Sequence, residues 1–146
     1  MFETTRVVTN LILTGTTRRH KGLQLIIPHA GAALPVLADR IAGVLGMLPM
    51  TSELQPDDVF VELRRIFYDV AGFALPRLLP ALLEITDRNH LVYGSDWPYS
   101  PEPVVVRLIS DLEKSKIFDQ AELTALWQGN ARSLFPRLSC LAHDHG

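Results

Sequence analysis

The chain is poor in cysteine: Cys140, near its end, is the only one. A single thiol excludes an internal disulfide and a cysteine-rich zinc site, and such scarcity is typical of a reducing compartment. No apolar run approaches the ~20 residues that a membrane-spanning helix needs, and the polar start lacks the layout of a signal peptide. The sequence therefore predicts a cytoplasmic protein that is not bound to a membrane.

The sequence also lacks a block of charge of one sign. Its 14 Lys and Arg and 16 Asp and Glu residues are interspersed and give a formal net charge of -2. Without a basic stripe, nucleic acid is not an expected partner. A nucleophile elbow, a Walker loop and a glycine-rich dinucleotide motif are absent as well, which excludes the chemistries that depend on them.

What the chain does have is enough apolar sequence for one core. Its 146 residues, 47% of them hydrophobic, suit one α/β domain. A mean hydropathy of +0.15 is apolar for so small a domain and suggests a surface meant for a partner.

Three short apolar runs predict strands, and apolar residues at helical spacing lie between them. The strands are expected at residues 23–27, 66–70 and 91–94. Helices are expected around Val7–Ile12, over 34–45 with a buried stripe of Leu34, Leu37, Ile41 and Val44 or Leu45, over 57–63 with Asp57 as cap, and over 75–85, 102–114, 119–129 and 130–135. Strands that alternate with helices predict βαβ units and a parallel sheet.

Two polar residues come directly after predicted strands, where parallel sheets carry functional groups. His29 lies among small residues and can serve as a base or a ligand, or simply bond to a nearby carbonyl. Asp96 can bind metal or carry a proton, or only cap its proline turn. Asp69 ends the middle strand and can reach the same face, or orient its neighbours.

The remaining histidines read as surface residues. His20 and His90 stand at element ends, and His143 and His145 belong to a polar chain end.

Five segments in order resemble the amidohydrolase-related decarboxylase family, which includes aminocarboxymuconate-semialdehyde decarboxylase and the decarboxylases of resorcylate and 6-methylsalicylate. The segments are Thr4-Thr5-Arg6 with 10–15, 29–35 with Arg40, Tyr68-Asp69-Val70-Ala71, Gly94-Ser95-Asp96-Trp97-Pro98 and 130–135. The sequence departs from the family at Ala32, where glycine is usual, and at Val70, where threonine is common.

The resemblance implies the carboxy-terminal portion of a metal-dependent (β/α)8 barrel, about three βα units over residues 1–138, with a polar tail at 139–146. It implies that His29 follows barrel strand six and is catalytic, and that Asp69 follows strand seven. Asp96, after strand eight, would be both catalytic and the metal ligand, with Trp97 beside the substrate. Both Trp97 and Tyr99 can instead simply pack.

The family's other ligands, a His-x-His pair and a strand-five histidine, are expected upstream of Met1. The complete site would hold zinc or manganese, for which this chain has too few ligands. The resemblance thus implies part of a non-oxidative decarboxylase of a small aromatic or unsaturated carboxylic acid, inactive as a monomer. We expect a homo-oligomer or pairing with a separate amino-terminal half-barrel. A hydrolase of the same superfamily, a non-catalytic remnant or binding module and a small regulatory domain are the alternatives.

Overall fold

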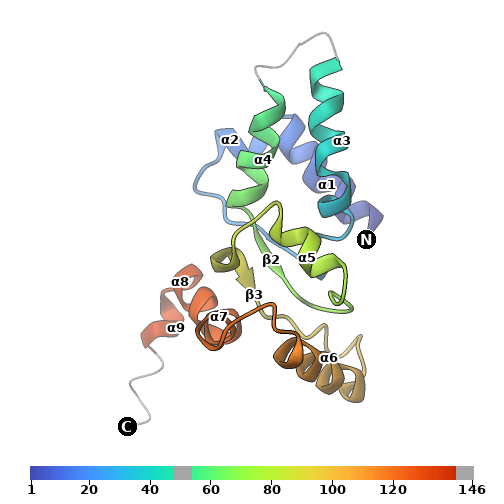
Figure 1. Cartoon of the computed structure of the whole chain (residues 1–146). Coiled ribbons are helices and arrows are strands. Elements are labelled where there is room, and N and C mark those ends of the chain that lie inside the picture. The colour runs from blue at the N-terminus through green and yellow to red at the C-terminus, as the bar shows by residue number, and fades with distance from the viewer. Residues whose placement is uncertain (48–53, 141–146) are drawn as a thin grey trace.

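The computed structural model describes residues 1–47 and 54–140. Three short strands form its centre, with helices α1 to α4 in the upper part of the view, α5 beside the strands, and α6 to α9 in the lower part (Figure 1). The helices and strands are α1 (Phe2–Leu13), α2 (Thr16–Arg19), β1 (Ile26–Ile27), η1 (His29–Gly31), α3 (Leu34–Met47), α4 (Pro56–Arg65), β2 (Phe67–Asp69), α5 (Leu78–Leu83), η2 (Arg88–His90), β3 (Leu91–Val92), α6 (Glu102–Lys114), α7 (Gln120–Thr124), the π-helical η3 (Ala125–Gly129), α8 (Asn130–Leu134) and α9 (Arg137–Cys140).

The three strands form a parallel sheet in the order β1-β2-β3. Ile26 and Ile27 pair with Phe67 and Tyr68, and Tyr68 in turn pairs with Leu91. The prediction of three parallel strands joined by helical segments is confirmed. Each strand is shorter than its apolar run, because the runs continue past the residues that have a strand beside them.

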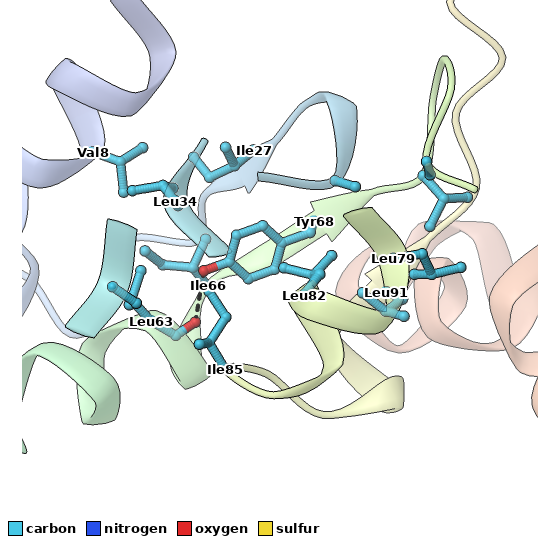
Figure 2. Close-up of a cluster of buried hydrophobic side chains, with 14 of the residues drawn as sticks. Val8, Ile27, Leu34, Leu63, Ile66, Tyr68, Leu79, Leu82, Ile85 and Leu91 are labelled. Atoms are coloured by element: carbon cyan, nitrogen blue, oxygen red, sulfur yellow. Dashed lines mark hydrogen bonds between the residues drawn. The ribbon is translucent and has the colours of Figure 1, made fainter. Parts of the chain in front are cut away.

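The middle strand carries the centre of the core. The side chain of Tyr68 is fully buried, and its hydroxyl donates to the carbonyl oxygen of Leu63 at 2.9 Å (Figure 2). Ile27, Leu34 and Leu82 surround the ring. Burial of this many apolar side chains around one strand supplies most of the stabilisation of the fold, at roughly 1.5–3 kcal/mol for each large side chain.

Two helix predictions need correction. The buried stripe of α3 consists of Leu34, Ala38, Ala42 and Leu45, whereas Val44 is exposed. Small alanines face the core because α3 packs closely against α4 and α5. Asp57 is not the cap of α4: Gln55 holds that position and exchanges capping bonds with Asp58.

The carboxy-terminal helices cover the free edge of β3. The amide of Tyr93 donates to the carbonyl of Leu126 at 3.1 Å, and the side-chain amide of Asn130 donates to the carbonyls of Leu91 at 2.7 Å and Arg88 at 2.9 Å. Parallel strands leave such groups unpaired at an edge. Here a helical segment pairs them in place of a fourth strand.

None of the helices in the described part of the chain is both long and apolar enough to cross a bilayer. The predicted tail begins within α9, and residues 141–146, with His143 and His145, lie outside the described residues.

Candidate active site at the carboxyl ends of the strands

The segment after β1 folds into an unusual left-handed turn. His29, Ala30, Gly31 and Ala32 all have positive φ, at 57°, 50°, 80° and 56°. Only Gly31 takes such a value without steric cost, because a side chain in this region approaches its own backbone. The Cβ that an alanine would add at Gly31 would lie 3.3 Å from the ring of Tyr68. The turn therefore packs closely against the core.

The carboxylate of Asp69, at the end of β2, holds this turn from one side. Its Oδ1 atom accepts hydrogen bonds from the backbone N–H of His29 at 2.8 Å and of Ala71 at 3.0 Å. One carboxylate oxygen thus joins the residue that follows β1 to the loop that follows β2. The prediction that Asp69 reaches the face of its neighbours agrees with this geometry.

Two glycines allow the strand ends to approach each other. A Cβ on Gly72 would lie 3.3 Å from Nδ1 of His29, and a Cβ on Gly94 would lie 3.1 Å from Cβ and Cγ of Asp69. The imidazole of His29 therefore lies against the loop after β2, and the side chain of Asp69 lies against the segment after β3. Side chains at both positions would push these groups apart.

Asp96 lies two residues beyond Gly94, in a tight loop. It has a φ of 61°, and its Oδ2 atom accepts a hydrogen bond from the hydroxyl of Ser100 at 2.9 Å. The amide of Ser100 also donates to the carbonyl of Asp96 at 2.8 Å. These two bonds to Ser100 hold the loop around Asp96, as its predicted role in the proline turn requires. The neighbouring Trp97 and Tyr99 are 68% and 90% exposed, so neither packs into the core.

A cavity of about 460 Å³ lies next to these strand ends. It separates the loop after β2 from α6, and its lining is mainly apolar. Arg107 and Asp111 form its charged part. Gly72, whose backbone also borders His29, belongs to the same lining.

Thr5 contacts the segment that carries His29 through a hydrogen bond that the sequence did not indicate. It is buried on α1, and its hydroxyl oxygen accepts a hydrogen bond from the backbone N–H of Ala33 at 3.1 Å. The signal was its position: Thr5, Val8 and Ile12 follow helical spacing on the buried face of α1. A polar residue on such a face needs a partner.

Residues in the described ranges do not supply a metal site by themselves. Among them, three or more His, Cys, Asp or Glu side chains nowhere gather closely enough to hold an ion. A catalytic zinc usually takes three protein ligands. The candidate ligands of this chain are therefore too few to hold a metal ion unless further ligands come from outside the chain.

In the described residues, the pKa values of three titratable groups of the core and its border are clearly shifted. Burial raises the pKa of Tyr68 far above its ordinary value and also raises that of Tyr93. Burial lowers the pKa of His90, partly offset by the charge of Asp87. The ring of His90 lies 4.7 Å from that of Phe67, so this histidine is half-buried rather than a plain surface residue.

Comparison with known proteins identifies the family. Residues 2–137 match the family model described as amidohydrolase, so the chain belongs to the amidohydrolase family. The 6-methylsalicylic acid decarboxylases of Penicillium expansum and Aspergillus aculeatus are 32% and 35% identical to it. Each match covers 93% of this chain but 42% of the relative, so the chain spans less than half the length of these enzymes.

Solved structures agree on the fold. The crystal structure of an amidohydrolase II matches with a TM-score of 0.81 and 31% identity over 91% of this chain and 42% of the other. A dihydroxybenzoic acid decarboxylase from Polaromonas, crystallised with manganese and 2-nitroresorcinol, matches with a TM-score of 0.72 over 88% and 38% of the two chains. Its identity is 18%, so this likeness concerns the fold. The predicted partial barrel of the amidohydrolase fold is confirmed.

Proposed function

We propose that this chain supplies one side of the active site of a non-oxidative decarboxylase acting on a small aromatic or unsaturated carboxylic acid. The observation that carries the proposal is the 35% identity to a 6-methylsalicylic acid decarboxylase across nearly the whole chain. The parallel sheet supports it, because His29 and Asp96 follow strands whose carboxyl ends share one edge.

His29 is the proton carrier in this proposal. Loss of carbon dioxide from a ring or a double bond leaves a carbon that must take up a proton, and a neutral or protonated imidazole exchanges protons near neutral pH. The left-handed turn and Gly72 keep the imidazole at the end of the sheet. Trp97, exposed beside Asp96, is available to lie against an aromatic substrate.

Asp96 is both the second catalytic residue and the metal ligand that this chain contributes. One of its oxygens bonds to Ser100, which fixes the carboxylate and leaves the other oxygen for a ligand or substrate. A divalent metal, zinc or manganese, belongs to the assembled site in this proposal. The remaining ligands come from outside the chain.

In the proposed function, the chain on its own has little decarboxylase activity. Its partner is either further copies of itself or a separate amino-terminal half-barrel, in the cytoplasm. Two surfaces are available for that contact: the edge of β1, which among the described residues pairs only with β2, and the exposed side of α6. Ile26 on β1 and Val106 on α6 are 38% and 59% exposed.

Metal analysis tests this proposal. The chain is mixed with the part of a 6-methylsalicylic acid decarboxylase that it does not align with, complex formation is verified by sedimentation, and zinc and manganese are quantified after gel filtration. We expect about one ion per complex, lost on Asp96→Ala and retained on Asp39→Ala, which removes an exposed carboxylate on α3. A complex without metal, or one whose metal is indifferent to Asp96→Ala, contradicts the proposal.

A further inference from the structure

We propose that Asp69 is a positioning residue: its carboxylate holds the left-handed turn 29–32 in the conformation that determines where the His29 imidazole lies. The inference rests on the proposed role of His29 and assigns to Asp69 a function distinct from metal or substrate binding. Its basis is the hydrogen bond from the His29 amide to Asp69 Oδ1, at 2.8 Å.

The turn needs such an anchor because its backbone is strained. Three of its four residues, His29, Ala30 and Ala32, carry side chains at positive φ. Backbone of this kind persists only where its surroundings determine it, and such segments concentrate at functional sites. Across the turn, the Ala32 amide donates to the His29 carbonyl at 2.9 Å.

The anchor is well placed for this task. Asp69 Oδ1 is shared between the amides of His29 and Ala71, so the charge of the carboxylate faces two N–H dipoles. Gly94 packs against the other side of the same carboxylate, 3.1 Å from its Cγ when a Cβ is placed on the glycine. The side chain therefore has little freedom to rotate away from His29.

A second anchor holds the far end of the turn. The amide of Ala33 donates to the buried hydroxyl oxygen of Thr5 at 3.1 Å, and that hydroxyl in turn donates to the carbonyl of Met1. The turn is thus fixed at both ends by side chains of other elements, Asp69 of β2 and Thr5 of α1. His29 is positioned from one end and Ala33 from the other.

Amide hydrogen exchange and histidine ring signals, measured by NMR on the chain itself, test the proposal. We expect the amides of His29 and Ala71 to be protected in the wild type. In Asp69→Ala, both should exchange about tenfold faster relative to core amides such as that of Leu79, and the ring signals of His29 should shift. Asp69→Asn, which keeps an acceptor oxygen, should restore most of the protection. Asp39→Ala is the matched control.

An unprotected His29 amide in the wild type overturns the proposal, and so does an Asp69→Asn variant that behaves like Asp69→Ala. If Asp69→Ala does not fold, Thr5→Val supplies the test at the other end, where it should speed exchange of the Ala33 amide and shift the His29 ring signals. Unchanged ring signals in folded Thr5→Val also count against it. These measurements need no turnover. A failure of the proposed decarboxylase activity can therefore be distinguished from a failure of the proposal for Asp69.

Discussion

At the scale of single residues, Ala32 has a backbone conformation that favours glycine. It has φ 56° and ψ -115°, and its side chain is buried. This conformation suits glycine, which the resembling family usually carries there, and costs an alanine free energy. In our proposal, Asp69 and Thr5 hold the turn from both ends and so keep Ala32 in this conformation.

Replacing Ala32 by glycine should therefore stabilise the protein. Relief of strain of about 1–3 kcal/mol outweighs the roughly 0.5–1 kcal/mol that glycine loses through the flexibility of the unfolded chain, for a net gain of about 1 kcal/mol. Denaturant unfolding measures it. Ala33→Gly is the matched control, because Ala33 is not among the residues with positive φ and should only be destabilised. A loss of stability in Ala32→Gly would show that the turn is not strained there.

At the scale of elements, the sequence predicts most of what its local patterns determine. The helix expected at about 102–114 is present as Glu102–Lys114, and the capping box of Asp119 and Glu122 is present with both bonds. The features that the sequence does not predict depend on contacts between residues that are far apart in the chain. The strand predicted at 23–27 is reduced to two residues, since pairing and not apolarity defines a strand.

In the candidate site, too, the sequence predicts the features that depend on local patterns and misses those that depend on distant contacts. The positions of His29 and Asp96 beyond strand ends could be read from the sequence, because parallel strands end at one edge. The four positive φ values in the 29–32 turn could not, since only Gly31 announces one. Nor could the bond between Thr5 and Ala33, which joins residues 28 positions apart.

The cap on the β3 edge is an element that can be tested directly. Asn130 is buried and gives two hydrogen bonds to carbonyls at this edge. Asn130→Ala should lower the free energy of unfolding by about 2 kcal/mol, roughly 1 kcal/mol for each bond, and should expose an unpaired strand edge. Thermal and denaturant unfolding measure the loss, and light scattering measures any aggregation. Asn10→Ala, on the exposed side of α1, should change neither.

At the scale of the whole molecule, the two sides of the sheet differ in what they leave open. The β3 edge is closed by the carboxy-terminal helices, whereas in the described residues β1 pairs only with β2. A complete (β/α)8 barrel typically needs about 250 residues, and this chain covers 42% of each of the two 6-methylsalicylic acid decarboxylases. In the proposed function, this chain therefore forms one wall of a site, and the other wall comes from outside it.

The release of carbon dioxide from 6-methylsalicylate tests this claim most directly. It is measured with the verified complex between this chain and the unaligned part of a 6-methylsalicylic acid decarboxylase. We expect turnover by the complex and almost none by either part. His29→Asn should lower the turnover of the complex by about 10²- to 10⁴-fold, and His20→Asn should not lower it. A complex that turns over equally well with His29→Asn, or an isolated chain as active as the complex, would contradict it.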